Sequence, residues 1–363
     1  MRVTSIRQRL RTLTASLVAA ASMAGLLAGP AMAEPKKEFE IAWTIYVGWM
    51  PWPYAADSGI IKKWADKYGI TINVTQINDY VESINQYTAG RFDGVTLTNM
   101  DALTIPAVGG VDTTALIVGD FSNGNDGIVS KSAKTVAELK GETINLVELS
   151  VSHYLLARAL DEAGLSEKDV TVVNTSDADM VAAFKAPDTT TVVTWNPLLA
   201  EVKAEPGANA LFDSAQIPGE IIDMLAVNTQ TLKDNPDFGK ALVGAWYETM
   251  ALVVDPGEAG QKARAAMGAL SGTDLAGFDA QLAATKLFPV PADAVAFVSG
   301  PDVVTTMENV RSFSFDHGLL GEGAPSADVV GIEFPGGKVL GDTGNVKLRF
   351  DPSYMALAAD GKL

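Results

Sequence analysis

Cysteine is absent from the 363-residue sequence, and histidine occurs only at His153 and His317. Without cysteine there can be no disulfide, thiolate zinc site, cysteine nucleophile or lipid attached at a cleavage-site thiol. The acidic run from Asp120 to Asp126 lacks the ligand register of a calcium loop and the glutamate that closes one. We therefore expect no metal site and no cofactor.

Long apolar stretches are also missing, apart from one near the start. The first 33 residues combine a positive beginning with four arginines, an apolar stretch from Leu17 to Leu27, and the small-residue pattern Ala31-Met32-Ala33. This order is typical of a signal peptide, and the apolar stretch is shorter than the ~20 residues of a membrane span. We expect cleavage after Ala33 and a mature protein that is soluble in the periplasm and not membrane-anchored.

Basic residues are scarce in the rest of the chain. Without the four arginines of the leader, 23 of the 27 basic residues remain against 44 acidic ones, a net charge of −21. Such a surface repels nucleic acid and anionic membranes and favours solubility. The expected partner is a small molecule, and we expect the protein to be a monomer. The remaining 330 residues exceed what one hydrophobic core usually holds, which predicts two lobes.

Short β-branched segments alternate with amphipathic helical ones, which predicts an α/β fold with parallel sheets covered by helices. The helical segments include Tyr80–Ala89 and His153–Ala163, each followed by a glycine. Two such series follow one another and indicate two lobes. The predicted strands are Phe39–Val47, Ile70–Ile77, Gly94–Thr98 and Thr114–Gly119, then Thr143–Leu149, Val170–Asn174 and Thr191–Trp195.

The predicted boundaries follow this alternation. After the signal peptide at 1–33, residues 34–122 begin lobe 1, residues 123–222 form lobe 2, and 223–330 return to lobe 1 as helices. The stretch from about Asn228 to Val254 is predicted to be helical, preceded by a short strand from Leu225. Residues 331–363 are a C-terminal extension to which the sequence assigns no packing.

Ligands of open α/β sheets bind at the carboxyl ends of the strands. The loops predicted there are aromatic, amidic and acidic, and they contain no lysine or arginine. The absence of an arginine fork disfavours an anionic ligand. Taken from these loops, the candidate ligand-binding residues are Tyr46, Trp49, Trp52, Asn99, Asp101, Asn123, Asp126, Glu148, Ser152, His153, Trp195, Asn196, Glu220 and Asp223.

Each candidate has a structural alternative. The rings can pack in the core, Asn99 and Asp101 can cap a helix, and Asp126 can hydrogen-bond within its turn. Glu148 is the first choice for an acid that binds the ligand, because it ends an otherwise apolar strand. Ser152 and His153 are adjacent and cannot form a nucleophile–base pair, so no catalytic residue is predicted.

Two motifs resemble periplasmic substrate-binding proteins of the nitrate/taurine/sulfonate type, which serve ABC importers. Ser150-Val-Ser-His-Tyr-Leu-Leu-Ala-Arg-Ala-Leu160 is similar to the family's ligand loop and following helix. Trp195-Asn196-Pro197-Leu198 is similar to its Trp-Asp-Pro-aromatic motif, with Asn196 and Leu198 departing from it. The resemblance implies a two-lobed type II-like periplasmic-binding-protein fold, a ligand between the lobes, closure by hinge motion, and transient docking on a membrane ABC permease.

The stretches YVGWMPW, NDYVESINQYTAG, TNMDALTIPA and GDFSNGNDGIV resemble more closely the branch associated with urea and guanidine carboxylases. That branch implies a guanidine- or urea-like ligand, and a guanidinium stacks on indole faces and donates hydrogen bonds to carboxylates. The alternatives are an anionic or zwitterionic solute held by backbone amides, an enzyme on the same fold, and a sensory module. Replacing Glu148 with Gln is expected to weaken a cation severely and an anion little.

Overall fold

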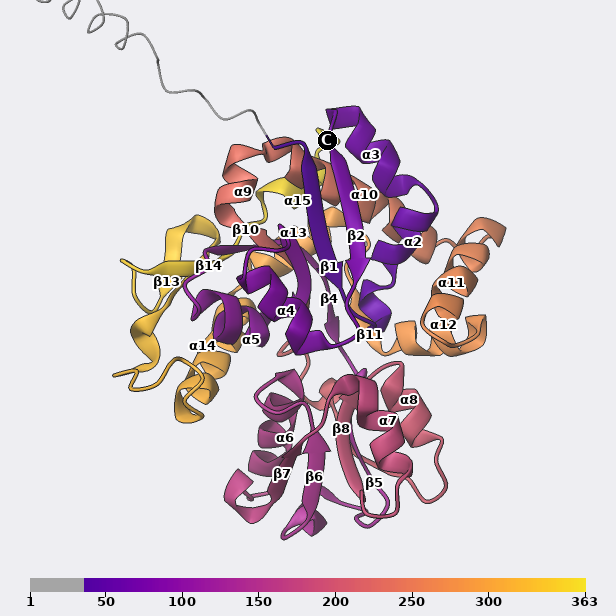
Figure 1. The fold of residues 1–363 in the computed structure, drawn as a ribbon, viewed down its shortest axis with the longest axis vertical. Coiled ribbons are helices and arrows are strands. Elements are labelled where there is room, and N and C mark those ends of the chain that lie inside the picture. Colours follow the sequence, from indigo (N-terminus) through magenta and orange to yellow (C-terminus); the bar gives the residue numbers. More distant parts are fainter. Residues whose placement is uncertain (1–35) are drawn as a thin grey trace, which may run out of the picture. The chain divides into compact units, whose positions relative to one another are not determined.

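The strands form two sheets, of nine and five strands, each flanked by helices, within the residues that the computed structural model describes (36–363; Figure 1). Lys37–Leu363 form one compact unit. The predicted signal peptide at 1–33 lies outside the described residues. Among the described helices, none combines the length and the apolar character that crossing a membrane requires.

The larger sheet has the strand order β13-β12-β14-β4-β10-β3-β1-β2, and β11 pairs with β4. We call this sheet and its helices the first lobe. Its strands are β1 (Glu38–Trp43), β2 (Thr71–Gln76), β3 (Gly94–Thr98), β4 (Thr113–Ser122), β10 (Ile222–Asn228), β11 (Thr285–Leu287), β12 (Gly331–Phe334), β13 (Lys338–Leu340) and β14 (Val346–Phe350). Its helices are α2 (Pro51–Asp57), α3 (Ile60–Tyr68), α4 (Tyr80–Thr88), α5 (Asn99–Ala102), α9 (Thr229–Asp234), α10 (Pro236–Val253), α11 (Glu258–Leu270), α12 (Leu275–Ala283), α13 (Pro291–Val298), α14 (Pro301–Asp316) and α15 (Ser353–Ala359).

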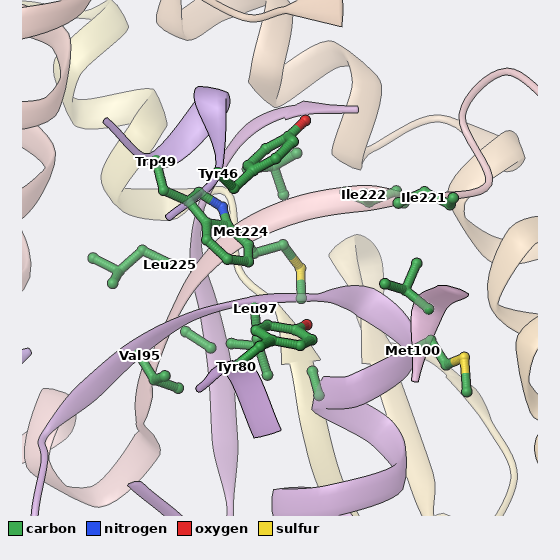
Figure 2. Packing of buried hydrophobic residues seen from close by; sticks show 14 of the residues in the cluster. Tyr46, Trp49, Tyr80, Val95, Leu97, Met100, Ile221, Ile222, Met224 and Leu225 are labelled. Carbon is green, nitrogen blue, oxygen red and sulfur yellow. The ribbon is translucent and has the colours of Figure 1, made fainter. Parts of the chain in front are cut away.

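The pairing directions bring the ends of five strands to the same end of the larger sheet. β1 runs parallel to β2 and β3, and β10 lies antiparallel between β3 and β4. The carboxyl ends of β1 to β4 therefore meet the beginning of β10. The strand centres are apolar and buried, as at Leu97 and Leu225, and Figure 2 shows the rings of Tyr46, Trp49 and Tyr80 close to these strands.

The smaller sheet has the order β7-β6-β8-β5-β9 and forms the second lobe with α6 to α8. The chain enters it between β4 and β5 and leaves it between β9 and β10. β5 lies antiparallel to β8 and β9, and β6 lies parallel to β7 and β8. Its elements are β5 (Asp126–Ser130), β6 (Thr143–Leu146), α6 (Val151–Glu162), β7 (Thr171–Asn174), α7 (Asp177–Lys185), β8 (Thr191–Trp195), α8 (Leu198–Lys203) and β9 (Asn209–Asp213).

Several local features of the structure differ from the sequence analysis or were left open by it. The sequence analysis did not predict β5, β9 or the short β11. The stretch from Asn228 to Val254 is not one helix, because Asn228 caps α9 and Pro236, which has no amide hydrogen, begins α10. Residues 331–363 pack as part of the first lobe, since β14 pairs with β4 through Leu348 and Thr113. Pairing over so long a separation leaves no local sequence pattern.

Candidate ligand-binding cavity

A small cavity lies where the two lobes meet. Its volume of about 10 Å³ is close to what one ordered water needs, so the lobes are closed tightly around it. Two contacts between the lobes border it: Trp195 Nε1 donates to Ile45 O (3.2 Å), and the Tyr80 amide donates to Asp177 Oδ1 (3.3 Å). The lining residues are Tyr46, Trp49, Tyr80, Thr98, Asp126, Val151, Trp195 and Asp223.

The sheet topology explains why these residues meet. Tyr46 and Trp49 follow β1, Tyr80 follows β2, and Thr98 ends β3. Asp223, at the start of β10, is paired with Thr98 on one side and with Asp120 on the other.

In the second lobe, Asp126 begins β5 directly opposite Trp195, which ends β8. Val151 begins α6 after Ser150, whose hydroxyl caps the helix by accepting from the Ser152 amide.

Four rings form a continuous aromatic wall. Tyr46 meets Trp49 edge to face at 5.1 Å between centroids, and Trp49 stacks on Tyr80 at 5.7 Å. Tyr80 meets Trp195 edge to face at 5.5 Å, so the wall crosses from the first lobe to the second. Figure 2 shows the first three rings side by side. Their faces and edges favour a flat or positively charged guest.

Buried aspartates form the polar part of the site. Asp126 and Asp223 line the cavity, and Asp120 lies behind them and accepts from the Tyr46 hydroxyl at 3.0 Å. Burial raises the pKa of Asp126 to about 7 and that of Asp120 to about 7. Burial, followed by the charges of Asp120 and Asp126, raises the pKa of Asp223 well above its usual value. The same burial and these acids raise the pKa of Tyr46.

Asp120 and Asp223 depend on each other for hydrogen bonding. Oδ2 of Asp120 and Oδ2 of Asp223 are buried and accept from no other group, and the two carboxyls hydrogen-bond to each other when one of them holds a proton. No lysine, arginine or histidine is among the described residues that line the cavity. Without a basic partner, buried acids are kept neutral by protonation, as the raised pKa values of these aspartates indicate, and they become charged only when a positive partner is present.

Asp101 positions the aromatic wall. Its Oδ2 accepts from Tyr80 Oη (2.7 Å) and from Thr98 Oγ1 (2.8 Å), and the Thr98 amide donates to Tyr80 Oη (3.0 Å). Burial raises the pKa of Asp101 to about 6. Asp101 does not line the cavity, but these bonds fix the Tyr80 ring that does.

Several predicted residues lie outside the cavity because they hold other parts of the fold. Trp52 is buried and stacks on Trp246 at 5.1 Å, the core packing that was its alternative. The Asn99 side chain bonds to the backbone of Glu220 and Ile222. Asn123 lies in the crossing between the lobes, where its amide donates to Ala284 O.

Glu148 is exposed, and the structure does not bring it to the cavity. The strand β6 ends at Leu146, two residues before it, so Glu148 is not on the expected strand end. Asn196 bonds to Asn125 Oδ1 (2.7 Å) and accepts from the Ala200 amide (3.0 Å). Glu220 accepts from Tyr154 Oη (2.6 Å) and from Arg158 Nε (2.8 Å).

The adjacent residues Ser152 and His153 are buried beside the cavity but do not line it. His153 accepts from the Leu149 amide through Nδ1 (3.1 Å), and its Nε2 contacts Glu167. The two histidines of the sequence lie next to each other, with ring centroids 5.6 Å apart, although 164 positions separate them. Because the two histidines are so far apart in the sequence, no local pattern predicted that they meet.

Five of the fourteen candidate residues thus meet at the cavity: Tyr46, Trp49, Asp126, Trp195 and Asp223. The sequence analysis missed Tyr80, Thr98 and Val151, and it did not select Asp120. Tyr80 follows the end of β2, so the rule applied to the other strands would have selected it. Thr98 was placed at the end of a strand and in the loop after it but was not selected as a candidate, and Val151 is apolar and carried no chemical signal.

The NMT1-like family matches residues 33–267 of the chain. A curated relative of Escherichia coli (strain K12), named "Putative aliphatic sulfonates-binding protein", is 34% identical over 84 residues, which is 23% of this chain and 26% of that protein. A second curated relative, a protein of Brucella abortus (strain 2308), is 27% identical over 155 residues. The chain spans only 26% and 46% of the length of these two relatives.

Solved structures share the fold. The alkanesulfonate-binding protein of Xanthomonas axonopodis pv. citri, solved with MOPS, has a TM-score of 0.65 and 17% identity, over 80% of this chain and 96% of that one. The nitrate-binding protein of Synechocystis PCC 6803 has a TM-score of 0.54 and 12% identity, over 90% and 99%. Identities this low show the fold alone, which is the two-lobed periplasmic-binding-protein fold predicted from the sequence. The family match covers well over half of the sequence, and the chain therefore belongs to the NMT1-like family.

Proposed function

We propose that this protein is the periplasmic solute-binding component of an ABC importer and that its solute is a small guanidinium-type cation. The observation that carries the proposal is the lining of the cavity, where Asp126 and Asp223 face four aromatic rings without a basic side chain. A guanidinium would supply the missing positive charge, stack on the rings and donate in-plane hydrogen bonds to the carboxylates.

The fold supports capture by closure. Both lobes contribute to the cavity, and the chain passes between them only at 123–125 and 214–221 within the described residues. We propose these two crossings, which lie beside the predicted boundaries after residues 122 and 222, as the hinge of opening and closing. Docking on a permease in the closed form is part of the same proposal, as is binding rather than catalysis.

A sulfonate or nitrate is the second candidate, because the relatives are named for such ligands. An anion in the cavity would lie next to Asp126 and Asp223, and like charges in a buried site repel strongly. Urea is neutral and could accept a hydrogen bond from a carboxyl group that retains its proton. The three ligand classes therefore differ in what they require of the aspartates.

Calorimetric titration of the mature protein with guanidine, methylguanidine, urea, taurine and nitrate tests the proposal. Guanidine should bind most tightly at pH 7.5, and Asp126→Asn should weaken it at least about 30-fold, since losing one partner of a buried charge pair costs about 2 kcal/mol or more. Glu148→Gln removes an exposed acid outside the cavity and is the matched control. Tight taurine or nitrate binding without a response to guanidine would refute the cation, and equal binding of urea and guanidine would refute selection by charge.

A further inference from the structure

Away from the cavity, three side chains converge from distant parts of the sequence. His153 lies in the first turn of α6, Glu167 begins a short 3-10 helix (Glu167–Asp169), and His317 directly follows α14. Nε2 of His153 and Nε2 of His317 each contact one oxygen of Glu167, and the three potential ligand atoms lie within 4.8 Å of one another. His153 is buried, and the other two are half-buried. No hydrogen bond of the ligand cavity involves this cluster.

The hydrogen bonds of His317 require a positive charge between it and Glu167; in the metal-free form this charge is a proton on Nε2, since Glu167 raises the pKa of His317, and a metal ion would take its place. Its Nδ1 lies 2.7 Å from Phe313 O, an acceptor, so the proton of the neutral ring is on Nδ1. Nε2 then presents a lone pair to a carboxylate oxygen. Two electron pairs that face each other repel unless a positive charge lies between them. The ring is held by the arrangement usual for metal ligands, with the other nitrogen bound to a backbone carbonyl.

We propose that His153, Glu167 and His317 form a binding site for a divalent transition metal ion, with Zn²⁺ as the best match. Two imidazoles and one glutamate are a donor set that zinc proteins use when a fourth position stays open. The fourth position is available here, because Glu167 and His317 also line a cavity of about 520 Å³ between α6 and α14. A water molecule in this cavity would complete a tetrahedral site.

The His153 ring must change its proton position to take part. In the metal-free form Nδ1 accepts from the Leu149 amide (3.1 Å), which places the proton on Nε2. Metal binding at Nε2 requires the proton on Nδ1 and therefore requires this amide to turn away. Leu149 is a non-glycine residue with φ of 62°, in the left-handed region that side chains disfavour, and it is 43% exposed. Rotation of the Glu148–Leu149 peptide would release that strain and present a carbonyl to Nδ1–H.

The site would join the two lobes. α14 packs against α5 and α13 of the first lobe, whereas α6 packs against β5 and β8 of the second. An ion held by His317 and by His153 with Glu167 would tie these helices together and favour the closed form. This inference does not depend on which solute the cavity holds.

The test uses the mature protein after treatment with a chelator and removal of any affinity tag. Zn²⁺ titrated by calorimetry at pH 7.5 should bind at one site per chain and raise the melting temperature. Co²⁺ should give the visible absorption of a tetrahedral site. Because the sequence has only two histidines, both imidazole signals should shift in NMR spectra when Zn²⁺ is added.

Glu167→Gln and His317→Asn should each weaken Zn²⁺ at least about 100-fold, since losing even an outer-shell partner costs 10–100-fold. Glu162→Gln removes an exposed acid from α6, the helix that carries His153, and should leave the affinity for Zn²⁺ unchanged. If Zn²⁺ binds these variants as it binds the wild type, the ion sits on surface carboxylates and the proposal fails. If the two imidazole signals of the wild type move with pH but not with Zn²⁺, a proton fills the gap and the proposal also fails.

Discussion

Asp120 and Asp223 lie opposite each other on the antiparallel strands β4 and β10, and one buried oxygen of each has no hydrogen-bond partner other than the neighbouring carboxyl. In the ligand-free protein, ionisation of both neighbouring acids in this buried sheet is unfavourable. Burial and the repulsion between the two carboxylates raise the pKa of Asp223. Under the proposed function, a guest that carries positive charge accounts for the pair. Stability and ligand binding should therefore respond in opposite directions when one acid is neutralised.

Asp223→Asn is expected to raise the melting temperature of the ligand-free protein at pH 8 and to abolish guanidine binding. The gain should shrink towards pH 4. A group whose folded pKa is raised stabilises the fold fully below its unfolded pKa of about 3.9, and that contribution is lost as pH rises through the folded pKa. Scanning calorimetry from pH 4 to 8 measures the effect. A melting temperature that falls at pH 8 would show that Asp223 is satisfied without a ligand.

Guanidine affinity should depend on pH around neutrality. Burial raises the pKa of Asp126 to about 7, so below pH 7 a cation must displace a proton from it. For one proton displaced from Asp126, the affinity should fall by about tenfold per pH unit between pH 7 and 5. Calorimetry in buffers of different ionisation enthalpy would detect the released proton. Asp126→Asn should bind weakly at every pH, and an unchanged slope in this variant would assign the proton to another group.

Glu220 is expected to stabilise the fold rather than bind the solute. It pairs with Arg158 through two hydrogen bonds, and their side chains are 15% and 29% exposed. Breaking such a partly exposed pair should cost about 1–2 kcal/mol, between the values for surface and buried pairs. Denaturant unfolding of Glu220→Gln measures the loss, and guanidine affinity should stay within about threefold of wild type, or 0.6 kcal/mol. A large loss of affinity with unchanged stability would return Glu220 to the site.

The sequence predicted the alternation of strands and helices because each element carries its own periodic pattern. β3 and β8 begin and end at the predicted residues, and both strands are fully buried. The two strands β5 and β9 were missed because their pairing partners are distant in sequence. Asp126, for example, begins a strand only because it is paired with Trp195.

The candidate site was predictable to the extent that it follows from strand ends. Trp195 ends β8, Tyr46 and Trp49 lie in the segment that follows β1, and all three line the cavity. Glu148 was misplaced because β6 is shorter than its apolar pattern suggests, and the loop after it turns the side chain to solvent. Which acids reach the cavity depends on strand pairing between distant parts of the chain, which places Asp223 between Thr98 and Asp120.

Gly48, in the YVGW stretch, is needed because the site leaves no space for a side chain there. A Cβ at this position would lie 2.6 Å from the Tyr46 ring and would also contact Asp120 Oδ2. Gly48→Ala should therefore displace the Tyr46–Asp120 hydrogen bond and destabilise the protein by about 1–3 kcal/mol, the usual cost of overpacking. Guanidine affinity should fall with it, because Tyr46 lines the cavity. Gly344→Ala is the control, since Gly344 is exposed and its nearest neighbour would be a side-chain atom at 3.2 Å. The contrary outcome is that both variants unfold at the wild-type denaturant concentration and bind guanidine as the wild type does. In that case Tyr46 and Asp120 move aside without loss of stability, and this side of the cavity is not rigid.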